Sequence, residues 1–282
     1  MSPSLSLPAL AVPWRDRQGR FSGLKLATLL LLCLPAALLA WWAAQGELGG
    51  RPVMEAIHWS GLWAVRILLL SLLVTPLRQM LRWPRVMQLR RMIGLAALAY
   101  ALLHLVLYAL DLKWDLAKVA SEIVLRIYLT IGFVALLGLV ALGVTSTDGW
   151  VRRLGGRRWQ ALHRLAYAIG ALALVHFALQ SKIDVTEAML MAGLFLWLMG
   201  YRLLAPKGAA PSLWRLALLA VAAALGTALL EAGWYAAATG VPPLPVLMAN
   251  LDVEFGLRPA LWVGIAGAAA FIIKATRQGL RP

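Results

Sequence analysis

The sequence has few charged residues and almost no cysteine. Only 14% of its 282 residues are charged, whereas a soluble domain carries about 25%. Cys33 is the single cysteine and lies within an apolar stretch. An internal disulfide, a cysteine zinc site and an iron–sulfur cluster are therefore excluded. Any redox centre must be held by groups other than thiolates, and the low charge indicates that lipid surrounds most of the chain.

Apolar residues make up 62% of the chain and fall into eight blocks. Each block is about 20 residues long, enough to cross ~30 Å of hydrocarbon at ~1.5 Å per residue. The first block is too long for a cleavable signal peptide, and no small-residue cleavage site follows it. We predict an all-α, polytopic membrane bundle with short loops and no soluble catalytic domain. The predicted spans are 23–44, 60–81, 92–112, 124–144, 160–180, 185–204, 213–238 and 258–275.

The net charge of +15 is distributed unevenly along the chain. Twenty of the 27 Lys and Arg residues fall in five segments that alternate with the other connections, and only Asp16 and Asp148 accompany them. The positive-inside rule then predicts a bacterial inner-membrane protein with both termini in the cytoplasm. The basic loop at 152–158 is interpreted as a topology signal facing anionic lipid rather than as a nucleic-acid site. The five segments are 15–25, 78–91, 152–164, 202–215 and 274–281.

Composition suggests three parts. Residues 1–22 form a basic tail, and residues 23–204 a core of six helices. A linker rich in Pro, Gly and Ala (APKGAAPS) opens the third part, 205–282, which adds two further transmembrane helices. Within that part, the VPPLP stretch of the 240–257 connection predicts an extended segment.

Two of the four histidines reach similar depths in the predicted spans. Counted from the basic side, His104 lies ~18 Å deep and His176 ~24 Å deep. Ionisable groups inside a membrane are costly and are usually functional, although a neutral His can simply bond to a neighbouring helix. Two neutral imidazoles facing each other across a bundle are what a six-coordinate haem iron needs.

The other two histidines lie near the surfaces. His163 is only ~4 Å deep and turned ~140° from His176 on an ideal helix, so it predicts a second, separate haem site nearer the basic side. His58 precedes the second predicted span beside Trp59 and Trp63. It is interpreted as an interfacial residue, with a secondary role at the outer haem edge as the alternative.

Three arginines are candidates for binding haem propionates, which need cationic partners. Arg66 is the one basic residue placed inside a span, and Arg126 opens the fourth span on the same outer side. Arg164, beside His163, is the candidate on the inner side. For Arg126 and Arg164, simple anchoring at the interface explains the position equally well.

Several segments resemble the MsrQ family, also called YedZ. They are RRMIGLAALAYALLHLVLYAL (90–110), LRIYLTIG (125–132), LGVTSTDGWVRRLGGRRWQALHRLAYAIG (142–170) and HFALQSK (176–182), together with IHWSG and LLVTPLR across 57–78. The similarity covers roughly 50–204, in order. MsrQ proteins belong to the ferric-reductase-like transmembrane superfamily, with NADPH oxidases as distant relatives, and usually end after six helices.

The resemblance implies a haem b subunit that delivers electrons to MsrP, a periplasmic molybdopterin enzyme that repairs oxidised methionine. The family's haem histidines correspond to His104, His163 and His176. Electrons would come from quinol or a cytosolic flavin reductase, and FMN binding has been attributed to the family. The chain itself would break no substrate bond. Two alternatives remain open at this point: a transmembrane ferric or cupric reductase, and a haem-free transporter or scaffold.

Overall fold

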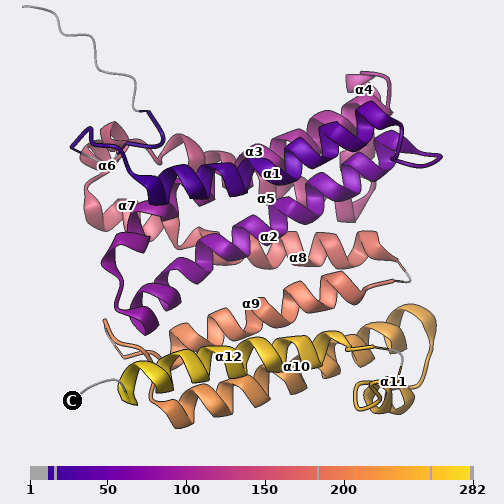
Figure 1. The fold of residues 1–282 in the computed structure, drawn as a ribbon. Helices are drawn as coiled ribbons and strands as arrows, with labels where there is room; N and C mark the ends of the chain where they lie inside the picture. Colours follow the sequence, from indigo (N-terminus) through magenta and orange to yellow (C-terminus); the bar gives the residue numbers. More distant parts are fainter. Residues whose placement is uncertain (1–11, 16–17, 183, 207, 255, 280–282) are drawn as a thin grey trace, which may run out of the picture.

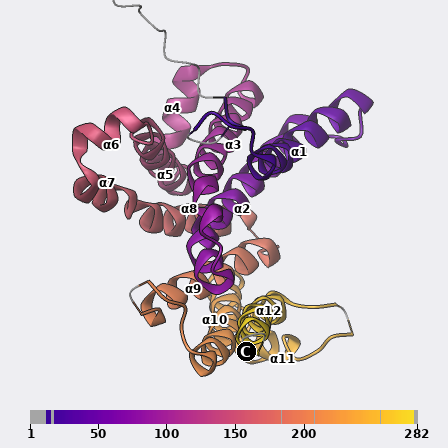
Figure 2. The ribbon, with the colours of Figure 1, turned by 60° about the vertical axis from the view of Figure 1, so that its left-hand side comes forward.

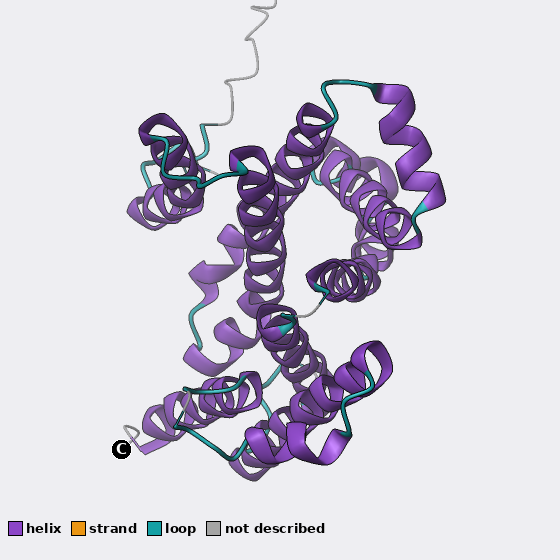
Figure 3. Cartoon of the chain, turned by 90° about the vertical axis from the view of Figure 1, so that its right-hand side faces the viewer, coloured by secondary structure: helices purple, strands orange, loops and turns teal. Residues whose placement is uncertain are grey.

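The computed structural model describes the chain except residues 1–11, 16–17, 183, 207, 255 and 280–282. Apart from an isolated bridge between Arg15 and Phe21, the described residues form helices and loops (Figure 3). Within them, eight helical segments are long and apolar enough to cross a membrane. The prediction of an all-α, multi-pass membrane protein is confirmed.

The spans follow the predicted blocks in order. They are α1 (Gly23–Gln45), α2 (Pro52–Leu81), η1 (Pro84–Leu89) continuing into α3 (Arg90–Asp111), α5 (Ile127–Val144), α7 (Gly156–His163) continuing into α8 (Leu165–Ser181), α9 (Thr186–Leu204), α10 (Leu213–Thr239) and α12 (Pro259–Gly279). The short helices outside the spans are α4 (Leu116–Leu125), α6 (Asp148–Leu154) and α11 (Pro243–Ala249).

Helix α2 lies at the centre of the bundle. It contacts α1, α3, α8, α9 and α12, while α5 contacts α3 and α8. Helices α10 and α12 pack on each other and on α9, on the side away from α1 and α3 (Figures 1 and 2). The C-terminal pair therefore extends the bundle along one side.

The apolar core is divided between the same two sides of the bundle, because α2 contributes to two separate clusters of buried residues. Val65 and Leu69 pack mainly with residues of α9, α10 and α12, whereas Ile67 and Leu68 pack with residues of α1, α3, α5 and α8. Large apolar side chains also face outward, as Leu31 and Leu229 do at 68% and 62% exposure. An apolar exterior of this kind suits lipid as the solvent.

The connections also separate by charge. The start of α1, the α2–α3 connection, α6, α7 and the end of α12 lie at one end of the bundle, and α4 and α11 lie at the other (Figure 1). The basic segments of the sequence are therefore gathered at one end.

Pro35 interrupts the hydrogen-bond ladder of α1, and Tyr100 of α3 bridges the break. The Tyr100 hydroxyl accepts from the Ala36 N–H at 2.9 Å and donates to the Leu32 carbonyl at 2.8 Å. These two groups bond directly in an unbroken helix, so the hydroxyl is inserted into the ladder. The Trp59 indole of α2 donates to the Pro35 carbonyl at 2.9 Å. The bend of α1 is thus tied to both neighbouring helices.

Pro76 leaves a similar gap in α2. A proline has no N–H, so the Leu72 carbonyl four residues earlier loses its helical donor. The Arg202 guanidinium of α9 donates to that oxygen and also to the Tyr167 hydroxyl of α8, the latter at 3.3 Å. A charged side chain therefore joins three helices at a proline kink.

A buried ion pair holds the C-terminal part together. Glu231 of α10 is fully buried and accepts hydrogen bonds from Asn250 at 2.9 Å and from Arg258 at 2.7 Å. Asn250 follows α11 directly, and Arg258 precedes α12. A buried carboxylate is tolerated in a membrane protein only when it is paired in this way.

Two predicted boundaries and one predicted conformation were wrong. The second span begins at Pro52 rather than 60, because proline is well suited to the first helical position, and His58 therefore lies inside α2. The fourth span begins at Ile127, because Arg126 has an extended backbone that separates α4 from α5. The predicted extended segment contains α11, whose prolines stand in the first turn, where N–H groups are not needed.

Candidate functional site

His104 of α3 and His176 of α8 meet inside the bundle. Their ring centroids lie 6.3 Å apart, and the ring planes are nearly perpendicular at 83°. The predicted similarity in depth has thus become a direct juxtaposition of two imidazoles from helices that are far apart in the sequence.

Each imidazole is fixed by a backbone carbonyl of another helix. His104 Nδ1 lies 2.8 Å from the Ile57 oxygen of α2, and His176 Nδ1 lies 2.7 Å from the Tyr128 oxygen of α5. A carbonyl can only accept, so Nδ1 carries the proton and donates it. The lone pair is then on Nε2, which is the form in which neutral imidazole binds a metal.

A glycine makes room for each ring. A Cβ atom on Gly61 would lie 2.8 Å from His104 Nδ1, and one on Gly132 would lie 2.7 Å from His176 Nδ1. Both distances are too short for any side chain larger than hydrogen. In α2 and in α5 the glycine follows the accepting carbonyl by four residues, so it lies one turn further along the same face. The two histidines therefore occupy niches of the same design.

The pair has the spacing of two imidazoles that would hold one metal atom between them. Imidazole–metal bonds are about 2 Å long, so two such bonds in line plus half of each ring place the centroids about 6 Å apart. Throughout the part of the chain that the structure describes, no group of three or more His, Cys, Asp or Glu could hold a metal ion. Two imidazoles are too few for a bare ion, but they complete an iron that a porphyrin already holds by four nitrogens. The residues present fit a haem.

His163 lies apart from this pair, at the end of α7. Its ring stacks on Trp159 at 3.9 Å between centroids. Its Nδ1 lies 3.1 Å from the Trp159 carbonyl, and its Nε2 lies 3.3 Å from the Ser146 hydroxyl. Both ring nitrogens thus have protein partners, and the structure brings no second histidine to this ring.

Arg66 and Arg126 are both paired. Arg66 of α2 lies 3.0 Å from the Glu187 carboxylate of α9 and 5.2 Å from the centroid of the Trp63 ring. Arg126 lies 2.5 Å from Glu122 and donates to the Tyr128 hydroxyl at 3.1 Å. The bond to Tyr128 and the nearby Glu122 charge raise the pKa of Arg126 above its ordinary value.

The remaining two candidates are exposed. Arg164 stands at the junction of α7 and α8, next to His163, and His58 lies on the second turn of α2. Neither forms a hydrogen bond or a ring contact with the His104–His176 pair, although His58 lies close enough to His104 for their charges to interact.

Reasoning from the sequence missed the groups that orient the imidazoles. Ile57 and Tyr128 act through their carbonyl oxygens, which any residue type supplies, so no side chain marks them. Gly61 and Gly132 did leave a signal, since each is a glycine in an apolar helix at the depth of a histidine, where glycine usually marks a close approach.

Comparison with known proteins places the chain in a family. Residues 60–175 match the family described as "Ferric reductase like transmembrane component". A protein of Xanthomonas campestris pv. campestris (strain 8004), named "Protein-methionine-sulfoxide reductase heme-binding subunit MsrQ", is 47% identical over 175 residues, which are 60% of this chain and 80% of the relative. The chain belongs to the MsrQ family.

Other members of the MsrQ family agree with this assignment. The Rhodospirillum rubrum protein of the same name is 42% identical over 193 residues, 67% of this chain and 89% of its own length, and that of Xanthomonas axonopodis pv. citri is 46% identical over 175 residues. No solved structure matches the chain. These MsrQ proteins are matched over most of their length, yet at least a third of this chain lies outside the alignments.

Proposed function

We propose that this protein binds haem b between His104 and His176 and carries electrons across the membrane. The observation that carries the proposal is the pair of facing imidazoles, each with Nδ1 bonded to a carbonyl. That bond selects the tautomer, fixes the ring and raises the basicity of Nε2. A haem supplies a one-electron centre whose potential depends on its ligands, nearby charges and burial.

The chain's own residues would hold and tune that centre. We propose Arg66 and Arg126 as partners of the outer propionates, in exchange for or in addition to their bonds with Glu187 and Glu122. Arg164 is proposed for the corresponding inner role. Each would keep a carboxylate ionised at the edge of the site by a charge-assisted hydrogen bond.

We propose the direction of electron transfer from the charge distribution and the family. We propose that the basic end of the bundle faces the cytoplasm of a bacterial inner membrane, with both termini there. Electrons would come from quinol or a cytosolic flavin reductase and leave to a periplasmic, MsrP-like molybdopterin reductase. The relatives' name supports this, since it describes a haem-binding subunit of a methionine sulfoxide reductase. Reduction of the sulfoxide would then occur on the partner.

We assign this role to residues 23–204, with 1–22 as a basic tail and 205–282 as an addition to the haem core. A second haem on His163 would require its Nε2 to leave the Ser146 hydroxyl. A pyridine haemochrome count per polypeptide on wild type and His163→Ala separates one haem from two, and a flavin assay of the same sample tests for FMN.

The test of the main proposal is a reduced-minus-oxidised spectrum of the purified protein. We expect a b-type α band in wild type and loss of the low-spin haem in His104→Ala and in His176→Ala. His58→Ala is the matched control, because His58 is an exposed histidine of the neighbouring helix. Low-spin haem that survives both substitutions would refute the ligand assignment.

A second candidate function is a transmembrane ferric or cupric reductase. The description of the matching family favours it, because ferric reductases share the same membrane component. The same haem would then pass electrons to a metal ion at the outer surface. The two functions separate in proteoliposomes: ferric citrate outside re-oxidises the haem under the second, whereas under the first re-oxidation needs the reductase subunit.

A further inference from the structure

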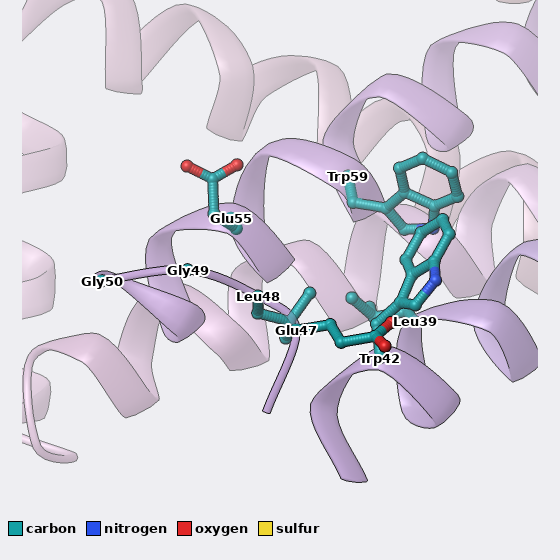
Figure 4. Close-up of a pocket in the computed structure, with 8 residues that line it drawn as sticks. All are labelled: Leu39, Trp42, Glu47, Leu48, Gly49, Gly50, Glu55 and Trp59. Atoms are coloured by element: carbon teal, nitrogen blue, oxygen red, sulfur yellow. The ribbon is translucent and has the colours of Figure 1, made fainter. Parts of the chain in front are cut away.

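A pocket lies at the end of the bundle opposite the basic segments, where α1 joins α2. Its volume is about 380 Å³, and its lining includes Trp42, Glu47, Glu55 and Trp59. Figure 4 shows the two indoles close together on one side of the pocket and Glu55 on the other, with the α1–α2 connection running between them.

The aromatic wall of the pocket is held in place. Trp42 and Trp59 pack edge to face, with centroids 4.9 Å apart and planes at 79°. The Trp59 indole N–H bonds to the Pro35 carbonyl at 2.9 Å, and its ring packs on Trp63 at 5.9 Å. These contacts hold Trp59 in place, so the indole that lines the pocket is ordered before any ligand binds.

The charge of the pocket is negative. Glu47 and Glu55 are both exposed, and no Lys or Arg is among the residues that line it. This contrasts with the chain as a whole, which carries +15. A second pocket, in contrast, is lined by both a basic residue, Arg51, and an acidic residue, Asp111. The pocket is therefore complementary to a cation.

The combination of indoles and carboxylates favours an organic cation over a metal ion. Ammonium and guanidinium groups bind to the faces of tryptophan rings within about 6 Å, whereas a hard metal ion needs more oxygen ligands than two carboxylates supply. A volume of about 380 Å³ accommodates the side chain of a lysine or an arginine.

The position of the pocket connects it with the haem site. Trp59 stands on α2 between Ile57, whose carbonyl holds His104, and Gly61, against which the His104 ring packs. One turn of α2 thus contributes to the pocket and to the niche of His104. His104 and His176 lie in the last two turns of α3 and α8, so a protein anchored in the pocket would lie at the end of the bundle that is nearer to this pair.

We propose that this pocket receives a lysine or arginine side chain of the protein that accepts electrons from the haem. The proposal rests on the electron-transfer function above and adds the surface and the chemistry by which the acceptor docks. Charged pairs at such a rim raise the association rate and orient the partner more than they add affinity.

The test uses full-length protein in nanodiscs of phosphatidylcholine, so that no anionic lipid competes. The variant Glu47→Gln/Glu55→Gln removes the two charges, and Asp252→Asn/Glu254→Gln is the matched control, since it removes two exposed acidic charges from another loop at the same end. An unchanged haem spectrum shows that each variant is folded.

The first readout is binding of fluorescein-labelled pentalysine, measured by anisotropy, which requires no electron transfer. We expect roughly tenfold weaker binding for the pocket variant and little change for the control. Trp42→Leu, which keeps both charges, should weaken binding by a smaller factor. Equal binding by wild type and the pocket variant, or equal losses in pocket variant and control, would overturn the proposal.

The second readout is re-oxidation of the reduced haem by the catalytic subunit of the Xanthomonas campestris methionine sulfoxide reductase. The pocket variant should need a higher concentration of that subunit for half the maximal rate, with the limiting rate unchanged. If wild type and the pocket variant need the same concentration of the subunit for re-oxidation of the haem, the docking proposal is overturned. The proposed electron-transfer function is not. If pentalysine binds wild type more tightly than the pocket variant but no electron reaches the catalytic subunit, the proposed function is contradicted. The proposed cation pocket is then still supported.

Discussion

At the scale of residues, two histidines are defined by what surrounds them. His104 and His176 each have a carbonyl bonded to Nδ1 and a glycine one turn further along the same neighbouring helix. The carbonyl determines which nitrogen is free, and the glycine determines how closely the ring approaches. Neither histidine could be placed this way by its own helix alone.

The glycine niches lead to a prediction for haem binding. Gly132→Ala places a methyl group against His176 and should displace the ring from the position in which it would bind the haem iron. Overpacking of this kind costs about 1–3 kcal/mol, which corresponds to roughly five- to 150-fold weaker haem binding. Gly61→Ala should act in the same way on His104. Haem titration of the apoprotein measures the effect.

Gly94→Ala is the control for both variants. Gly94 lies in α3, and a Cβ atom there meets nothing within 4 Å. If Gly94→Ala weakens haem binding as much as Gly132→Ala does, the role of the niches is refuted.

Arg66 provides a test of the local charge. A cation near the iron favours the reduced state, which carries one more electron, so Arg66→Gln should lower the midpoint potential of the haem. Its effect on stability should stay below about 1 kcal/mol, because its pairing with Glu187 is partly exposed. Arg51→Gln, at the exposed start of α2, is the control for a redox titration. An unchanged potential in Arg66→Gln would remove it from the haem environment.

At the scale of elements, prolines interrupt the hydrogen-bond ladders of two helices, and side chains from neighbouring helices bond to the backbone groups left open there. In α1 the Tyr100 hydroxyl bonds to both Ala36 and Leu32. In α2 the Leu72 carbonyl is bonded by Arg202. Since lipid offers no hydrogen bonds, each unsatisfied group would be costly.

The role of the Tyr100 hydroxyl at the interrupted turn of α1 can be tested by a double-mutant cycle. Tyr100→Phe should destabilise the protein by about 1–3 kcal/mol, because it leaves buried backbone groups unpaired. Pro35→Ala removes the proline that disrupts the ladder, so the Ala36 N–H can bond the Leu32 carbonyl directly and the combined variant should recover part of that loss. Thermal unfolding in detergent gives the values, with Tyr108→Phe as control. If Tyr100→Phe lowers the stability equally with and without Pro35→Ala, the hydroxyl does not compensate for the proline.

Elements that depend on local composition could be predicted from the sequence, and those that depend on packing could not. The eight spans follow from apolar length alone, and their order held. The first turns of α2 and α11 were not predicted, because proline usually interrupts a helix. Proline is in fact well suited to the first turn of one. The His104–His176 meeting was predicted from depth, whereas the carbonyls of Ile57 and Tyr128 are found only when the helices are packed.

At the scale of the whole molecule, charge and architecture agree. The basic segments collect at one end of the bundle, and the pocket formed by Trp42, Glu47, Glu55 and Trp59 lies at the other. A donor on the basic side and an acceptor on the opposite side would then be joined by a haem held within the bundle.

The proposed orientation predicts a labelling pattern. With Cys33 replaced by Ser, an impermeant maleimide added to intact spheroplasts should label Glu254→Cys, in the loop after α11, and should not label Arg277→Cys near the end of α12. Both positions are exposed, so permeabilised cells should label both. Labelling of Arg277→Cys in intact spheroplasts would reverse the orientation.

The most direct test of the central claim is the EPR spectrum of the oxidised, purified protein. Two imidazoles whose planes are nearly perpendicular, at 83°, give low-spin ferric haem a strongly anisotropic signal with one very large g value. We predict that signal in wild type and its loss in His104→Ala and His176→Ala. A main species that is high-spin in wild type, or a low-spin signal that persists without either histidine, would contradict the account.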